Sequence, residues 1–148
     1  MKALVKTFAA AALIAVSTFA MAAEGLGSKS AKANVNLSTA DFALDHYVAV
    51  TTAGESTGVE QLFAEDFNQN VQASNTKTNS RGEVVKYLKK QKGEKLNCTV
   101  TTDIIEESAD YMVAKVTLKF ESFTKTDLVT LERVGNEWKV SKSINSYK

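Results

Sequence analysis

The sequence is poor in several residue types that would restrict its fold or its chemistry. Its 148 residues include no proline, seven glycines, one cysteine and one histidine. With 44% hydrophobic and 24% charged residues, the composition is that of a globular protein and excludes linker-like, collagen-like and disordered chains. The single cysteine, Cys98, excludes an intramolecular disulfide, so the hydrophobic core must stabilise the fold without one.

Motifs for metals, cofactors and nucleophilic catalysis are lacking as well. One histidine (His46) and one cysteine cannot complete a closed metal site, and the carboxylates lack calcium-loop spacing. No G-x-G-x-x-G, Walker A or G-x-S-x-G pattern occurs. We therefore expect no cofactor and no metal. We read His46 as a surface residue and Cys98 as a buried, inert thiol.

The chain also lacks a strong excess of charge of one sign. Its formal net charge is +1, and removing Lys2 and Lys6 with the N-terminal segment leaves 16 basic against 17 acidic residues, or −1. Nucleic acids and anionic membranes attract proteins through basic surfaces. We therefore expect no nucleic-acid partner and no stable membrane anchor.

The first 22 residues have the pattern of a signal peptide. Lys2 and Lys6 precede an apolar stretch at residues 8–16, which is too short to span a bilayer, and Ala20-Met21-Ala22 offers an A-x-A cleavage site. An uncleaved membrane anchor is the alternative interpretation. We expect cleavage after Ala22, export to the periplasm or medium, a flexible leader at residues 23–37 and a single domain at residues 38–148.

Three helix starts and then a run of strands indicate an α+β fold. The helices are expected at about residues 38–52, 57–64 and 80–91, each opening with a pattern of the capping-box type. A short strand is expected at about 67–73. Alternating patterns predict four more strands at about 96–104, 111–123, 127–134 and 137–147, the last two joined by a Gly135-Asn136 turn. The predicted inward residues are Leu96, Cys98, Val100, Thr102 and Ile104; Met112, Ala114, Val116, Leu118 and Phe120; and Trp138, Val140 and Ile144.

This order of elements and four local motifs resemble the NTF2-like superfamily. The motifs are YVAVTTAGE at 47–55, VEQLFAED at 59–66, SRGE at 80–83 and EWKV at 137–140. The superfamily includes the ketosteroid isomerases, SnoaL-like polyketide cyclases and small exported lumazine-binding-like proteins. The resemblance implies an NTF2-like, cystatin-like cone, in which three N-terminal helices pack on a curved antiparallel sheet.

The same resemblance implies roles for particular residues. The oxyanion-hole tyrosine of the isomerases falls on Tyr47, their general base near Val71 and their protonated acid near Thr130. Neither Val71 nor Thr130 has a carboxyl group, and a shifted alignment to Asp66 or Asp127 does not restore the family spacing. Because proton abstraction needs a base within reach of the proton, we expect that isomerase activity is lost.

These observations leave alternatives for the function open. We expect an exported, non-catalytic domain that binds a small apolar or amphipathic ligand in the cone or a protein partner on the sheet. An isomerase, cyclase or dehydratase that uses Tyr47 with an unrecognised acid such as Asp66 is one alternative, and a filled cone with a purely structural role is another. A homodimer could form through the polar outer face of the sheet. Candidate pocket residues, each also a plausible core or loop residue, are Tyr47, Phe63, Asn70, Tyr87 and Trp138.

Overall fold

The structure, a computed structural model, describes residues 34–73 and 75–148, all within one compact unit. The predicted signal peptide and residues 23–33 of the predicted leader lie outside these residues. Among the described residues, no helix is long and apolar enough to cross a membrane. The elements, in chain order, are α1 (Ala40–Thr52), α2 (Val59–Leu62), β1 (Phe63–Gln72), β2 (Lys77–Ser80), α3 (Arg81–Lys90), β3 (Thr99–Glu107), β4 (Tyr111–Lys119), β5 (Thr124–Val134) and β6 (Glu137–Tyr147).

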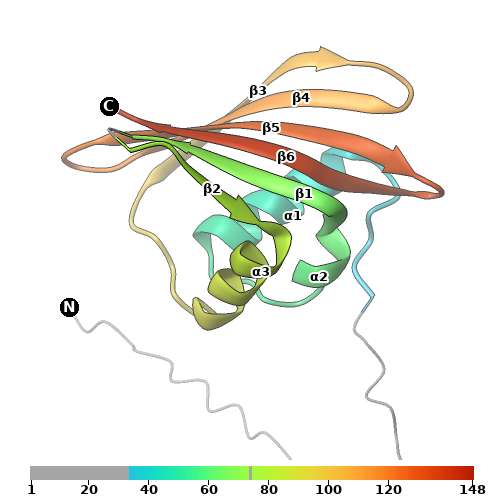
Figure 1. The fold of residues 1–148 in the computed structure, drawn as a ribbon, viewed down its shortest axis with the longest axis horizontal. Coiled ribbons are helices and arrows are strands. Elements are labelled where there is room, and N and C mark those ends of the chain that lie inside the picture. The colour runs from blue at the N-terminus through green and yellow to red at the C-terminus, as the bar shows by residue number, and fades with distance from the viewer. Residues whose placement is uncertain (1–33, 74) are drawn as a thin grey trace, which may run out of the picture. The chain divides into compact units, whose positions relative to one another are not determined.

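The strands form one six-stranded sheet in the order β2-β1-β6-β5-β4-β3, and the three helices lie on its concave side (Figure 1). Neighbouring strands are antiparallel except β1 and β6, which are parallel. The expected α+β cone is therefore confirmed, with one difference from a fully antiparallel sheet. The difference is that β1 runs parallel to its neighbour β6.

Local capping explains where the helices begin. Ser80 and Glu83 form the predicted capping box of α3, and Thr39 caps α1 by accepting a hydrogen bond from the Phe42 amide at 3.2 Å. The box predicted at Thr57 is absent. Glu55 accepts from the amides of Ser56 and Thr57 instead, and α2 begins after Gly58 with a single turn.

The domain begins earlier than the predicted boundary at Ser38. Leu37 is buried in the core, and its carbonyl accepts from the Trp138 amide at 2.7 Å. The side-chain amide of Gln61 bonds both the N–H and the C=O of Val35, at 3.1 and 2.9 Å. This paired contact works like a strand pairing, so residues 35–37 belong to the domain and not to a flexible leader.

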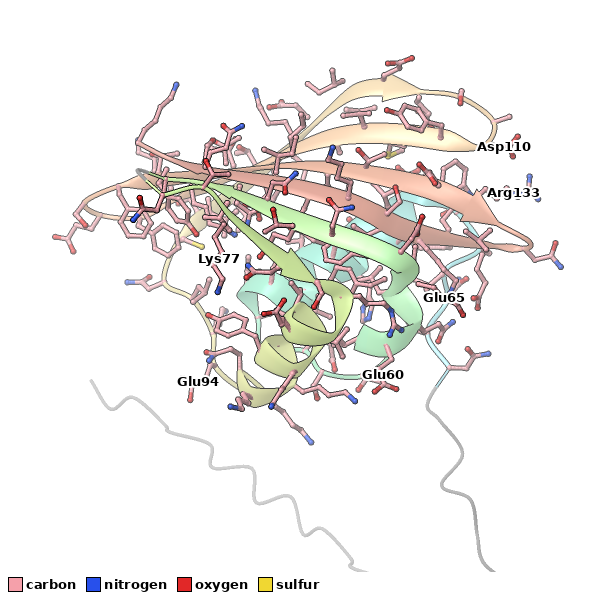
Figure 2. All side chains as sticks on the ribbon, viewed as in Figure 1. Glu60, Glu65, Lys77, Glu94, Asp110 and Arg133 are labelled. Atoms are coloured by element: carbon pink, nitrogen blue, oxygen red, sulfur yellow. The ribbon has the colours of Figure 1, made fainter. Side chains whose placement is uncertain are left out.

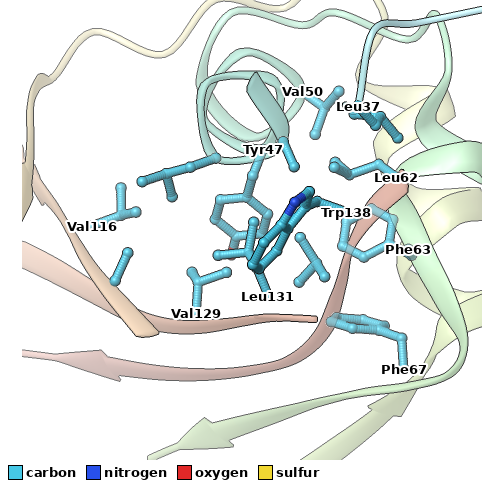
Figure 3. Packing of buried hydrophobic residues seen from close by; sticks show 14 of the residues in the cluster. Leu37, Tyr47, Val50, Leu62, Phe63, Phe67, Val116, Val129, Leu131 and Trp138 are labelled. Carbon is cyan, nitrogen blue, oxygen red and sulfur yellow. The ribbon is translucent and has the colours of Figure 1, made fainter. Parts of the chain in front are cut away.

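The core lies between the concave face of the sheet and the helices (Figure 3). Alternate residues of β4 point into this core, as predicted. The rings of Tyr47 and Phe63 pack edge to face, with their centroids 6.3 Å apart. The buried sheet residues are Phe63, Phe67, Met112, Ala114, Val116, Leu118, Val129, Leu131, Trp138 and Val140; the helical ones are Ala40, Ala43, Leu44, Tyr47, Val50, Val59, Leu62, Val84, Val85 and Leu88.

Two predicted inward faces are wrong in part. On β3, Thr102 and Ile104 are exposed, because this edge strand lies beyond the area that the helices cover. On β6, the pairing with β5 shifts from Leu131–Val140 to Thr130–Lys142, which leaves Ser141 as a bulge. A bulge reverses the alternation beyond it, so Ser143 and Asn145 point inward in place of Ile144.

Candidate functional site

A cavity of about 580 Å³ opens between the concave face of the sheet and helices α1 and α3. This size is typical of small-molecule sites in proteins. Helices α1 and α3, strands β1, β2, β5 and β6, and the α3–β3 and β4–β5 loops contribute to its wall. The lining residues are Tyr47, Thr51, Phe63, Gln69, Val71, Lys77, Asn79, Glu83, Val84, Tyr87, Leu88, Leu96, Phe120, Phe123, Lys125, Asn145 and Tyr147.

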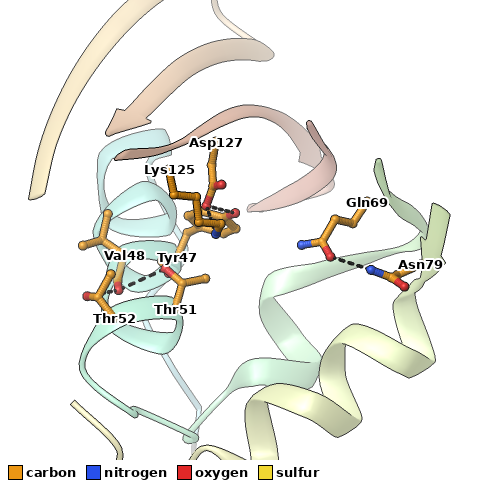
Figure 4. A network of polar contacts seen from close by, with 8 residues as sticks. All are labelled: Tyr47, Val48, Thr51, Thr52, Gln69, Asn79, Lys125 and Asp127. Carbon is orange, nitrogen blue, oxygen red and sulfur yellow. Dashed lines mark hydrogen bonds and ion pairs between the residues drawn. The ribbon is translucent and has the colours of Figure 1, made fainter. Parts of the chain in front are cut away.

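A buried polar network lies at the inner end of the cavity (Figure 4). The Tyr47 hydroxyl donates to Asp127 Oδ2 at 3.1 Å, and Lys125 Nζ donates to the same oxygen at 2.8 Å. Lys125 and Asp127 are two residues apart on β5, so both side chains point to the concave face. The Tyr47 hydrogen bond links α1 to the sheet, and the ion pair holds its acceptor carboxylate within β5.

The electrostatics of this network keep Tyr47 protonated. Burial of the phenol raises the pKa of Tyr47 well above its ordinary value, and the nearby charge of Asp127 raises this pKa further. At neutral pH the hydroxyl is therefore a donor, and Asp127 Oδ2 takes up that donor. Among the described residues, Asp127 Oδ1, Ser143 Oγ and Asn145 Oδ1 are buried without a hydrogen-bond partner.

Most of this network is not evident from the sequence alone. Asp127 enters there only through a shifted alignment with the isomerases, and the strand is predicted to start at this residue. Extending the alternation of Val129 and Leu131 backwards would have placed Asp127 and Lys125 on the inner face. Asn145 reaches the cavity only through the bulge at Ser141, for which the sequence carries no clear signal.

The mouth of the cavity is lined by exposed apolar side chains. Tyr87, Tyr147, Phe123 and Leu96 are 60%, 49%, 41% and 38% exposed. Phe123 stacks on Phe120 with ring centroids 4.4 Å apart and planes at 13°. Clustered apolar exposure of this kind is unusual on the surface of a monomer and is typical of a binding site.

The structure brings together three of the five candidate pocket residues. Tyr47, Phe63 and Tyr87 line the cavity, although Tyr87 stands at its mouth and not in the core. Trp138 is buried in the core away from the lining. Asn70 is also not a lining residue, and its side chain accepts a hydrogen bond from Thr78 at 3.0 Å.

The acid–base positions implied by the resemblance separate in space. Val71 lines the cavity, so the general-base position is present but holds an aliphatic side chain. Thr130 lies between the inward residues Val129 and Leu131 and therefore faces the other side of the sheet. Asp66 is exposed and outside the lining. Asp127 is the carboxyl group that reaches Tyr47.

The remaining sequence candidates lie away from the cavity. His46 is half-buried and not on the surface as predicted; burial lowers its pKa, and Nε2 has no partner among the described residues. Cys98 is half-buried against the core. In the part of the chain that the structure describes, no three histidine, cysteine or acidic side chains lie close enough together to hold a metal ion.

Comparison with known proteins identifies the fold. No family model and no curated protein matches the chain. Solved structures do match it. An NTF2-like protein of unknown function from Silicibacter pomeroyi superposes with a TM-score of 0.60 and 13% identity, covering 72% of this chain and 90% of that one. The chain has the NTF2-like fold.

Two further neighbours with the NTF2-like fold agree. A proposed ketosteroid isomerase from Parabacteroides distasonis has a TM-score of 0.55 and 13% identity over 82% of this chain and 93% of its own. An NTF2-like protein of unknown function in nutrient uptake from Rhodospirillum rubrum has a TM-score of 0.55 and 17% identity, over 73% and 97%. At these identities the likeness establishes the fold alone, because the NTF2-like fold hosts many unrelated functions.

Proposed function

We propose that this protein binds a small amphipathic ligand in its cone cavity and does not transform it. The observation that carries the proposal is the cavity itself: about 580 Å³, with a polar inner end and exposed aromatic side chains at its mouth. Burying those aromatic rings against a ligand is favourable by about 25 cal/mol for each Å² of apolar surface removed from water. The polar inner end orients a ligand that carries a matching head group.

The non-catalytic part of the proposal rests on the chemistry of the inner end. Tyr47 already donates its only proton to Asp127, and Asp127 Oδ2 also accepts from Lys125. A ketone entering the cavity would therefore have to compete with Asp127 for the Tyr47 proton. Val71 lines the cavity but offers no base, and Asp66 lies outside the lining. These features support holding a ligand more than moving its protons.

A fluorescence titration with N-phenyl-1-naphthylamine, which brightens in apolar surroundings, tests binding. We expect saturable binding that Tyr87→Ser weakens. Ile105→Ser is the matched control, because Ile105 is 58% exposed but outside the cavity, against 60% for Tyr87. Absence of saturation, or equal weakening by both substitutions, would contradict the proposal. Native mass spectrometry of the purified protein would then show whether a natural ligand co-purifies.

Asp127 supports a second candidate function, an acid–base enzyme that uses Tyr47. The carboxylate and phenol are 3.1 Å apart beside the cavity, which is the geometry of a proton-transferring pair. Turnover of an enolisable ketone that Tyr47→Phe abolishes, without loss of stability, would favour this enzyme over the binding protein. We expect no turnover above the Tyr47→Phe background.

Export and self-association are part of the proposal. Lys2, Lys6 and the A-x-A site support cleavage after Ala22, which intact-mass measurement of the exported protein tests directly.

On the outer face of the sheet, Leu128 and Ile144 pair across β5 and β6, and such an apolar centre with a polar rim supports a homodimer. Light scattering of the wild type and of Leu128→Lys tests this: a monomeric wild type would contradict it.

A further inference from the structure

We propose that the cavity selects an organic anion, with the anionic head at the Lys125 ammonium group, the apolar body against the apolar wall, and Lys77 as a second cation of the lining. This inference rests on the proposed ligand-binding function and specifies its ligand class. Two lysines and one carboxylate, that of Glu83, line the cavity. The position of each charge decides which sign a ligand meets.

At one end, the buried ion pair presents its cationic member. The Lys125 side chain is 18% exposed and lines the cavity, whereas the Asp127 side chain is 0% exposed and lies behind it. One proton of the ammonium bonds Asp127, which leaves two protons for another acceptor. A ligand at the inner end therefore meets an ammonium group and not the carboxylate that holds it.

Across the sheet from Lys125, Lys77 supplies a second cation of the lining. Across the sheet, Lys77 pairs with Val71, Val71 with Asn145, and Asn145 with Asp127. Three strand spacings separate β2 from β5, so the two lysine-bearing strands are roughly 14 Å apart and their side chains flank one space. Figure 2 shows Lys77 on the helix side of the sheet. Among the described residues, Lys77 has no carboxylate within 4.0 Å.

The single carboxylate of the lining is committed elsewhere. Glu83 Oε2 accepts from the Ser80 amide at 2.7 Å and from the Ser80 hydroxyl at 2.8 Å, as the second half of the α3 capping box. These hydrogen bonds lower the pKa of Glu83 and hold its charge at the helix N-terminus. The charge of Lys77 also contributes to lowering the pKa of Glu83, so Glu83 offsets part of the positive potential of Lys77, but it forms no ion pair with either lysine.

The apolar part of the wall distinguishes an organic anion from an inorganic one. Val71, Val84 and Leu88 also line the cavity. Phosphate or sulfate would leave these side chains in water. A carboxylate or sulfonate on an aromatic or aliphatic body would cover them and also reach an ammonium group.

Two related fluorescent probes test the charge preference separately from binding itself. N-Phenyl-1-naphthylamine is neutral, and 8-anilino-1-naphthalenesulfonate has the same ring system with one sulfonate. We compare the ratio of their affinities in the wild type, in Lys77→Met, and in Lys125→Met/Asp127→Leu, which removes the buried pair as a unit. Lys142→Met is the control, because Lys142 is exposed on β6 and outside the lining.

We expect the preference for the sulfonate to fall about threefold in Lys77→Met, the size of a partly exposed charge contact. We expect a fall of about tenfold in the double variant, where the contact is more buried. Lys142→Met should not change the ratio. An unchanged ratio in both cavity variants, with the neutral probe still bound, would overturn the anion inference alone. Failure of both probes to bind the wild type would overturn the proposed function and this inference together.

Discussion

Replacing Lys125 by methionine should destabilise the protein strongly, because it removes the ammonium group that is paired with a fully buried carboxylate. Asp127 is 0% exposed, and Oδ2 accepts from Lys125 Nζ at 2.8 Å and from the Tyr47 hydroxyl at 3.1 Å. Breaking a buried ion pair by removing one partner costs about 3–5 kcal/mol. Because the Lys125 side chain is partly exposed and the Tyr47 hydrogen bond remains, we expect about 3 kcal/mol.

For a domain of this size, that loss corresponds to a fall in melting temperature of roughly 10 °C. Urea denaturation followed by circular dichroism measures the free energy of unfolding directly.

Removing both members of the pair provides the control. In Lys125→Met/Asp127→Leu no charge is left buried, and the main cost is the Tyr47 hydroxyl without its acceptor, about 1–2 kcal/mol. The double variant should therefore be more stable than Lys125→Met alone. A free energy of unfolding of Lys125→Met within 0.5 kcal/mol of the wild type, roughly the scatter of surface substitutions, would refute the reasoning. A double variant less stable than Lys125→Met would refute it as well.

Three further predictions concern stability. Because the pKa of Tyr47 is raised in the fold, the protonated phenol stabilises the protein below about pH 10, and this stabilisation is lost as the pH rises further. Between pH 8 and pH 11 the free energy of unfolding should therefore fall more for the wild type than for Tyr47→Phe. Gly54 has a φ of +67°, and an added Cβ would lie 2.5 Å from the backbone of the α3–β3 loop. Gly54→Ala should therefore lower the free energy of unfolding by more than 2 kcal/mol, which is about the upper figure for a left-handed residue. Gly82→Ala is the control: its added Cβ meets nothing within 4 Å, so the substitution should be nearly neutral in the same urea assay. Ser80→Ala should lower the free energy of unfolding by about 1 kcal/mol, because the helix loses its N-cap. Since Ser80 lowers the pKa of Glu83, the difference in stability between the variant and the wild type should shrink as the pH falls through that pKa. An unchanged difference at pH 3 would contradict this.

The sequence predicted the parts of the fold that repeat a simple period. Alternation in β4 and the capping box at Ser80 carried enough signal to place a strand face and a helix start. Strand β2 was missed because its four residues are polar and lie at the edge of the sheet, where no inward face is buried. Phe63 was assigned to the end of a helix, but the single-turn helix α2 ends at Leu62 and β1 starts at Phe63.

The candidate site could be predicted only where it lies on regular elements. Tyr47 follows from the resemblance and from the helix pattern, and Phe63 was predicted as a pocket residue although on a helix; both line the cavity. Asn145 depends on the bulge at Ser141, which arises from pairing across β5 and β6 and not from local sequence. The burial of the Lys125–Asp127 pair depends on the helices that cover this part of the sheet. On a strand exposed to solvent, the same two residues would form an ordinary surface ion pair.

The proposed ligand binding depends most on an open, accessible cavity, and filling that cavity is the direct test. Val71 lines the cavity on β1, whereas Val113 is half-buried on the outer face of β4. Affinity for N-phenyl-1-naphthylamine should therefore fall at least tenfold in Val71→Trp and stay within twofold of the wild type in Val113→Trp, with both variants folded by circular dichroism; these thresholds correspond to about 1.4 and 0.4 kcal/mol. Equal binding by Val71→Trp and the wild type would contradict the proposal that the ligand lies inside the cone.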